Sequence, residues 1–127
     1  MTTTLFEPGA ALRPIRRLFI ANRSEIAVRV IRACRDEGIV PIVAYADSDR
    51  DALFVRLADE AYPLGGERPA ETYLDAAKLI AIALRASADA VHPGYGFLSE
   101  RAEFARAVQE AGLIWVGPDP HVIEALG

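Results

Sequence analysis

The residue types best suited to chemistry gather in one segment, from His92 to Glu100, which reads His-Pro-Gly-Tyr-Gly-Phe-Leu-Ser-Glu. Glycines on both sides of Tyr95 let the backbone turn tightly and expose amide N–H groups. The tyrosine can present a flat ring face or a hydroxyl to a polar ligand, and a helix that begins nearby attracts anions. The segment is either a binding loop for a small planar or anionic group or a structural turn with packed aromatic side chains. The spacing favours neither interpretation.

Metal chemistry finds little support elsewhere in the chain. His92, at a predicted strand end, is expected to be a hydrogen-bonded structural residue and His121 a solvated one, because neither has a Cys or carboxylate nearby at metal-ligand spacing. Three alternating aspartates resemble calcium ligands, but the Gly and Glu that a calcium loop requires do not follow them. We expect Asp47, Asp49 and Asp51 to be loop and cap residues, and we expect no metal site.

The segment that follows the first apolar run, Ala21 to Glu25, lacks the glycines of a dinucleotide-binding turn. No Walker-type phosphate loop occurs either. The missing glycines argue against an oxidoreductase that uses a nicotinamide or flavin cofactor. We expect Asn22 and Glu25 to cap the following helix, which leaves Arg23 available to form an ion pair or to contact a ligand.

Short apolar runs alternate with longer helical patterns from Leu18 onward, and these elements must position the candidate residues. Strands are expected over residues 18–21, 42–46, 61–62, 90–92 and 113–116, and helices over 24–37, 52–58, 72–85, 99–111 and 120–126. This alternation predicts an α/β, Rossmann-like, mostly parallel five-stranded sheet with helices on both faces. Ligands bind such sheets beyond the carboxyl ends of the strands. The loops at 22–23, 47–51 and 93–96 are therefore expected on the working edge.

Two helix starts can be proposed from capping residues. Thr72 with Asp75 three residues later is the pattern of an N-cap pair, and Ser99 is expected to cap the next helix. The first of these helices is expected to turn a set of apolar side chains inward, namely Leu74, Ala77, Ile80, Ala81 and Leu84.

The composition is that of an ordinary globular protein, with 127 residues, 52% of them hydrophobic and 25% charged. We expect a flexible tail over residues 1–15 and one domain over 16–127, with no membrane span and no secretory signal. The net charge of −4 gives no reason to expect a nucleic acid or an anionic membrane as partner. The single cysteine, Cys34, fits a reducing cytoplasm and is expected to be a buried, inert thiol.

The first predicted helix carries polar side chains away from its apolar stripe. Arg29, Arg32 and Asp36 share this face, with the last two at the i,i+4 spacing of an ion pair. The face is either solvated or a polar subunit interface, in which arginine is enriched.

The chain as a whole resembles the opening of the biotin carboxylases. The residues that carry the resemblance are Ala21–Ala27, Arg29, Ile31–Cys34, Ala58–Ala61, Tyr73–Leu74, His92–Glu100, Gly112 and Gly117–Pro118. The match runs from about Arg17 to Gly127. It implies the pre-ATP-grasp domain of the biotin carboxylase part of an acyl-CoA or pyruvate carboxylase. Other ATP-grasp enzymes share the fold of this domain but not the sequence that begins at His92.

The resemblance also implies a reaction and a set of roles. Biotin carboxylases use MgATP and bicarbonate to form carboxyphosphate, and the carbon dioxide is then placed on N1′ of biotin attached to a carrier protein. By resemblance, Tyr95 and Gly96 line the biotin pocket, in a loop shaped by His92, Pro93 and Gly94. The homodimer interface is implied at Arg29, Arg32 and Asp36.

The implied partners are the ATP-grasp and C-terminal domains of the same enzyme, a carboxyltransferase and the carrier. The residues that act on ATP and Mg belong to those domains, so no catalytic residue is expected in this segment and the chain alone is expected to be inactive. The alternative is a stand-alone dimerisation or partner-binding module without catalysis. Three positions depart from the family's pattern: Ser24 replaces a glycine, Asp36 a glutamate and Arg101 an asparagine.

Overall fold

A computed structural model describes residues 14–117 and Ile123. The strands are β1 (Arg17–Ile20), β2 (Val40–Tyr45), β3 (Glu60–Pro63), β4 (Ala90–His92) and β5 (Ile114–Trp115). The helices are α1 (Ser24–Glu37), α2 (Leu53–Leu57), α3 (Ala76–Arg85) and α4 (Ala102–Glu110), with short 3-10 turns η2 (Asp47–Asp49) and η3 (Pro69–Glu71). Most of the predicted tail and of the helix predicted over 120–126 lies outside the described residues.

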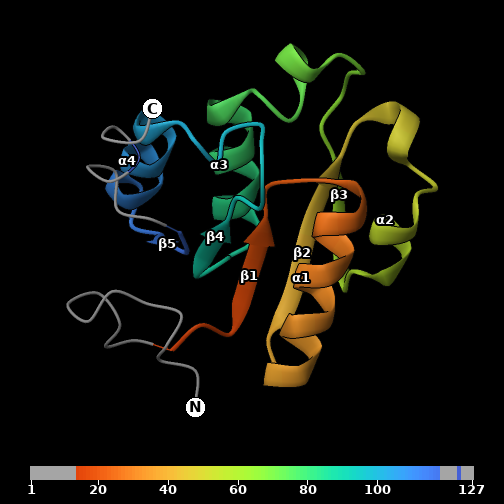
Figure 1. Ribbon diagram of the computed structural model, residues 1–127, viewed down its shortest axis with the longest axis horizontal. Coiled ribbons are helices and arrows are strands. Elements are labelled where there is room, and N and C mark those ends of the chain that lie inside the picture. Colours follow the sequence, from red (N-terminus) through yellow and green to blue (C-terminus); the bar gives the residue numbers. More distant parts are fainter. Residues whose placement is uncertain (1–13, 118–122, 124–127) are drawn as a thin grey trace.

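The five strands form one sheet in the order β3-β2-β1-β4-β5, and every pair of neighbours is parallel (Figure 1). This confirms the predicted α/β sheet and makes it parallel throughout. The first strand lies at the centre, where Phe19 pairs in register with Ile42 of β2 and with Val91 of β4. A continuous apolar run suits that place, because a central parallel strand is covered on both faces.

Successive residues of β1 enter two different cores, as the pleat of a strand requires. Leu18 and Ile20 pack on the face covered by α1 and α2, together with Ile31, Cys34, Val43 and Phe54. Phe19 packs on the face covered by α3 and α4, together with Ile42, Leu79, Val91 and Phe104. The predicted helices on both faces are thus confirmed. None of the helices in the described part of the chain is long and apolar enough to cross a membrane.

Helix α1 has the predicted bounds, but its predicted capping is wrong. Arg23 occupies the N-cap position and no side chain caps the helix. Ser24 follows with a φ of 60°, in the left-handed region, which costs a residue with a Cβ about 1–2 kcal/mol. This is the position at which the resemblance expects a glycine. At the other end, Gly38 ends the helix with a φ of 74°, in the left-handed region that glycine adopts readily.

Helix α3 begins later than predicted. Its N-cap is Asp75, whose side chain accepts a hydrogen bond from the backbone N–H of Lys78 at 3.0 Å. Thr72 lies outside the helix, is fully buried, and donates its hydroxyl to the carbonyl of Arg68. The backbone around Thr72 is held by the η3 turn, so the side chain is not available to cap a helix.

The buried face of α3 also differs from the predicted one. Leu79, Ile82 and Ala83 enter the core, whereas Leu84 is 49% exposed. In the set predicted to point inward, Ala77, Ala81 and Leu84 are exposed, so the prediction is wrong for these three. Leu74 and Ile80 are partly buried and pack against the core, as predicted.

Ser99 does not cap α4, which begins three residues further on at Ala102. Its backbone N–H instead donates to the carbonyl of Gly96 at 2.9 Å, so Ser99 closes a turn of the preceding loop. The N-cap position is occupied by Arg101, without a side-chain hydrogen bond. Extra turns thus separate β4 from α4, and they belong to the loop that carries the candidate binding residues.

Candidate functional site

Three loops follow β1, β2 and β4 at the carboxyl edge of the sheet, and side-chain contacts join them. Asn22, only 2% exposed, makes the first connection. Its Nδ2 donates to the carbonyls of Pro93 at 2.8 Å and Tyr95 at 2.5 Å, and its Oδ1 accepts the N–H of Arg23 at 2.8 Å. The predicted cap residue therefore holds the loop after β4.

The backbone of this loop is tightly turned. Gly94, Gly96 and Phe97 have φ values of 68°, 65° and 49°. A Cβ at Gly94 would lie 2.7 Å from Nδ2 of Asn22, so a side chain does not fit there. The Nδ1 atom of His92 accepts the N–H of Gly94 at 3.0 Å, which confirms a hydrogen-bonded histidine at the strand end.

Lowering the pH from 7.5 to 5 is expected to destabilise the fold through His92. Burial holds the pKa of His92 below its ordinary value of 6.5, so the folded chain binds this proton less readily than the unfolded chain. The contribution of His92 is present above pH 6.5 and is lost as the pH falls through the folded-state pKa. The slope is up to about 1.4 kcal/mol per pH unit. Urea denaturation across this range measures it, and His92→Gln should remove this part of the slope. An equal slope in both proteins would contradict the assignment.

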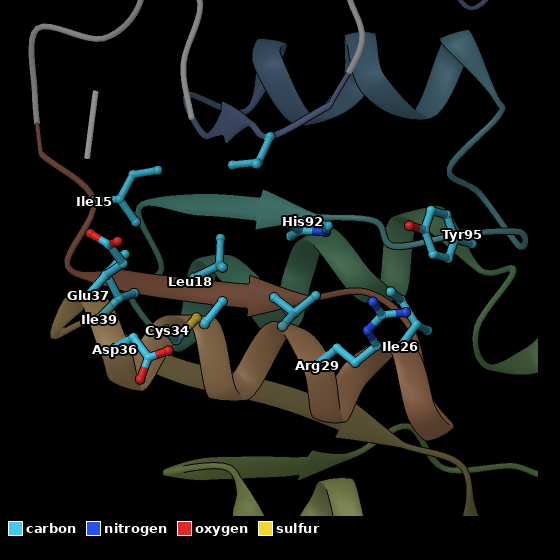
Figure 2. A pocket seen from close by; sticks show the side chains of 13 residues that line it. Ile15, Leu18, Ile26, Arg29, Cys34, Asp36, Glu37, Ile39, His92 and Tyr95 are labelled. Carbon is cyan, nitrogen blue, oxygen red and sulfur yellow. The ribbon is translucent and has the colours of Figure 1, made fainter. Parts of the chain in front are cut away.

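Tyr95 is the most exposed large side chain of the loop, at 72%. In Figure 2 it lies near Ile26, at the start of α1, with its hydroxyl on the side of the ring toward His92. A tyrosine that is neither buried nor hydrogen-bonded within the described chain is available to a ligand. This geometry agrees with the binding interpretation of the loop, while the turns of Gly94 and Gly96 agree with the structural one.

A buried acid, Asp49, connects the other two loops. Asp49 accepts two hydrogen bonds from Arg23, from Nε and Nη2 at 2.7 Å each. It also accepts the hydroxyl of Tyr73 at 2.7 Å, and that hydroxyl accepts the N–H of Ala46. Asp49 lies in the connection between β2 and α2, as expected, and it is also the centre of a side-chain network.

The charges of this network reinforce one another. Hydrogen bonds from Arg23 and then Tyr73 hold the pKa of Asp49 below its ordinary value, against the effect of burial. The bond to Asp49 raises the pKa of Arg23. Burial, followed by the bond to Asp49, raises the pKa of Tyr73. At neutral pH the network therefore holds an ion pair and a neutral phenol.

An aromatic contact joins the Asp49 network to the loop after β4. The rings of Tyr73 and Phe97 lie 5.4 Å apart, and the guanidinium of Arg23 lies 5.8 Å from the Tyr73 ring. Asn22 thus holds the start of the loop and Tyr73 contacts its end. One signal in the sequence could have pointed to this: Arg23 and Asp49 follow neighbouring parallel strands, whose carboxyl ends meet at one edge.

A groove of about 390 Å³ runs along α1 over the sheet. It is lined by apolar residues of α1 and β1, with His92 and Tyr95 toward one end and Asp36 and Glu37 at the other (Figure 2). Arg29 also lines it. The structure therefore brings part of the predicted loop and part of the predicted polar face to one groove. Pro93, Gly94, Gly96 and Arg32 are not among its lining residues.

The polar face of α1 is exposed at Arg29, Arg32 and Asp36. The ion pairs found in the described residues do not include the one suggested by the spacing of Arg32 and Asp36. Arg35 instead pairs with Asp59 at 2.9 Å, which joins α1 to the start of β3. Two of the three predicted interface residues are arginines without an ion-pair partner in this part of the chain.

Cys34 lies on the buried face of α1, as predicted, and burial raises its pKa to about 11, so the thiol is protonated at neutral pH. Within residues 14–117, no three His, Cys, Asp or Glu side chains are grouped as a metal site would require.

A parallel sheet whose loops contact one another at its carboxyl edge is the architecture of a Rossmann-like domain. Residues 14–123 match the family described as biotin carboxylase, N-terminal domain, and the chain belongs to that family. It is 55% identical over 113 residues to the biotin-dependent acyl-coenzyme A carboxylase alpha3 subunit of Mycobacterium leprae, covering 89% of this chain and 19% of that protein. It is 45% identical to biotin carboxylase 1 of Bacillus subtilis, covering 89% of this chain and 25% of that protein.

Solved structures agree with this assignment. The biotin carboxylase domain of the 2-oxoglutarate carboxylase of Hydrogenobacter thermophilus matches with a TM-score of 0.85 and 44% identity, over 91% of this chain and 25% of that one. That domain was solved as a dimer in complex with MgADP, ADP and bicarbonate. The chain thus spans a quarter or less of the length of each of these three relatives.

Proposed function

We propose that this chain acts as the N-terminal part of an ATP-dependent biotin carboxylase, and that it supplies the loop that lines the biotin pocket. The observation that carries the proposal is the loop of Tyr95 and Gly96. Asn22 holds this loop through the carbonyl of Tyr95, while the Tyr95 side chain stays exposed. In the reaction, bicarbonate and MgATP give carboxyphosphate and ADP, carboxyphosphate breaks into carbon dioxide and phosphate, and the carbon dioxide replaces the proton on N1′ of carrier-bound biotin. Tyr95 and Gly96 would hold the biotin, and His92, Pro93 and Gly94 would shape the loop.

The nucleotide and the magnesium ion are assigned to other parts of the enzyme, the ATP-grasp and C-terminal domains. No described loop has the glycine pattern of a phosphate site, and the described acids form no metal-binding group. ATP supplies the activation of bicarbonate. This domain would contribute orientation of biotin and a wall of its site.

We also propose that α1 contributes to a homodimer contact through Arg29, Arg32 and Asp36. These side chains are exposed on one face of the helix, and a relative's biotin carboxylase domain forms a dimer. Further proposed partners are the biotin carrier protein and a carboxyltransferase. We place the enzyme in the cytoplasm, which suits a reduced Cys34.

A chimera tests the proposal. Residues 14–123 of this chain replace the matching segment of the Bacillus subtilis biotin carboxylase, and biotin-dependent ATP cleavage is measured. We expect an active enzyme in which Tyr95→Ala raises the KM for biotin about tenfold, the effect of losing one aromatic contact of about 1.4 kcal/mol, and leaves the KM for ATP unchanged.

Two matched variants sharpen the test of Tyr95. Tyr95→Phe separates the hydroxyl from the ring, and Leu53→Ala removes another exposed apolar side chain, on α2, without changing biotin kinetics. An unchanged KM for biotin in Tyr95→Ala would overturn the role of Tyr95. A folded chimera that sediments as a dimer but never cleaves ATP would favour the alternative, a dimerisation module without catalysis.

A further inference from the structure

Asn22 has a buried side chain whose polar atoms are all engaged. Three hydrogen bonds use its Nδ2 and Oδ1, and their partners fix the orientation of the amide, because only nitrogen can donate to two carbonyls. A buried amide bonded in this way costs little in desolvation and has few alternative rotamers. Asn22 is therefore a rigid contact between the end of β1 and the loop after β4.

The two carbonyls held by Asn22 determine where the neighbouring N–H groups point. In a planar trans peptide the C=O and the following N–H point in opposite directions. The carbonyl of Pro93 points to Asn22, so the N–H of Gly94 points away from it, and it is found donating to His92.

By the same rule, the carbonyl of Tyr95 points to Asn22, and the N–H of Gly96 must point away from the buried amide. Gly96 is exposed, and a Cβ built on it would meet nothing within 4 Å. The outward N–H of Gly96, next to the exposed ring of Tyr95, is positioned to donate a hydrogen bond to a polar ligand.

We infer that Asn22 is a positioning residue of the biotin site, which directs the Gly96 N–H and the Tyr95 side chain outward by holding the carbonyls of Pro93 and Tyr95. The inference rests on the proposed function. Asn22 is buried beneath the loop, so we expect it to act through the peptide units that it holds. Without it, the peptide between Tyr95 and Gly96 is free to flip, and the donor is lost from the outer side.

The first test uses the full 127-residue chain and needs no ligand. Asn22→Asp keeps the size of the side chain and the acceptor for the N–H of Arg23, but replaces the donor with a carboxylate oxygen. We expect hydrogen exchange of the loop amides of Gly94 and Ser99 to become at least tenfold faster. The amide of Ile39, which bonds to Cys34 at the far end of α1, should be unchanged. Unchanged loop amides would overturn the inference.

The second test measures kinetics in the chimera. Asn22→Asp should raise the KM for biotin about tenfold at pH 8, with the KM for ATP unchanged. The introduced carboxyl regains a donor when protonated, so the KM should fall again toward pH 6, which a purely structural defect would not produce. Val108→Ala is the matched control, because it weakens the core under α4 at a residue outside the loop.

The outcomes separate the two claims. If Tyr95→Ala raises the KM for biotin and Asn22→Asp lowers only the amount of active enzyme, the positioning role of Asn22 is overturned. If neither variant changes the KM for biotin while the loop amides exchange faster, the proposed function is wrong at this loop, and Asn22 positions the loop for another purpose.

Discussion

Replacing Gly94 with alanine should cost the fold about 3 kcal/mol more than the same change at Gly38. Both glycines have a positive φ, 68° and 74°, so both substitutions carry the strain of the left-handed region. Only at Gly94 does the new Cβ meet an atom, at 2.7 Å from Nδ2 of Asn22. To make room, the Asn22 amide must release the carbonyls of Pro93 and Tyr95, and a buried carbonyl left unpaired, as at Pro93, costs about 1–3 kcal/mol.

Urea denaturation of the unsubstituted chain, Gly94→Ala and Gly38→Ala measures this difference in the free energy of unfolding. Gly96→Ala provides a further comparison. Gly96 has a φ of 65° and open space around its Cβ position, so its loss should resemble that of Gly38. In the chimera, Gly94→Ala should also weaken the use of biotin. Equal destabilisation at Gly94 and Gly38 would show that Asn22 moves aside without cost and is not a rigid contact.

Removing the buried carboxylate with Asp49→Ala should destabilise the chain by about 3 kcal/mol. The substitution takes away the acceptor of two bonds from Arg23 and one from Tyr73, and bonds to a charged group are worth about 1.5–3 kcal/mol. The side chain of Asp49 is 9% exposed and that of Arg23 40%. Arg23 can therefore turn to water, which keeps the loss below that of a fully buried pair.

The chain offers a matched control at the opposite edge of the sheet. Glu60 accepts bonds from Arg17 and Tyr62, the same residue types, but with both charged side chains about 30% exposed. Glu60→Ala should cost about 1 kcal/mol or less, because solvent screens an exposed pair. Equal losses at the two sites, measured by urea denaturation, would show that burial adds nothing to the Asp49 network.

The same network predicts how stability depends on pH. The pKa of Asp49 is lowered in the folded chain, so its contribution is present above the ordinary value of 3.8 and is lost as the pH falls through the folded-state value. The pKa of Tyr73 is raised, so its contribution is present below pH 10 and is lost above it. Asp49→Asn should therefore flatten the loss of stability below about pH 4, compared with the unsubstituted chain.

The sheet could be predicted from the sequence because its strands are short apolar runs between polar segments. A run such as Leu18–Ala21 has few alternatives to a buried strand, and α1 has a clear apolar stripe with Gly38 at its end. The position of the working edge then follows from the parallel connections. The loop at Tyr95 could be found from its residue types alone. The contacts that hold the loop and the exposure of Tyr95 could be seen only in the structure.

The helix caps and the contacts between loops could not be predicted in the same way. Thr72, Asp75 and Ser99 are all good caps, and which of them begins a helix depends on turns that precede it. Asn22 suits a cap as well as a contact with carbonyls 71 and 73 residues away, and local propensity cannot decide between them. The role of Asp49 likewise depends on Tyr73, which lies 24 residues further along the chain.

The central place of β1 has a consequence for how the domain is made on the ribosome. This strand is synthesised before the others, yet one of its edges waits for β4, and the N–H of Arg17 reaches a carboxylate 72 residues later, that of Asp89. Until then the nascent chain carries an apolar strand with an unpaired edge, which invites pairing with other chains. The interval between the synthesis of β1 and that of β4 is the period in which chaperones and aggregation compete for this domain.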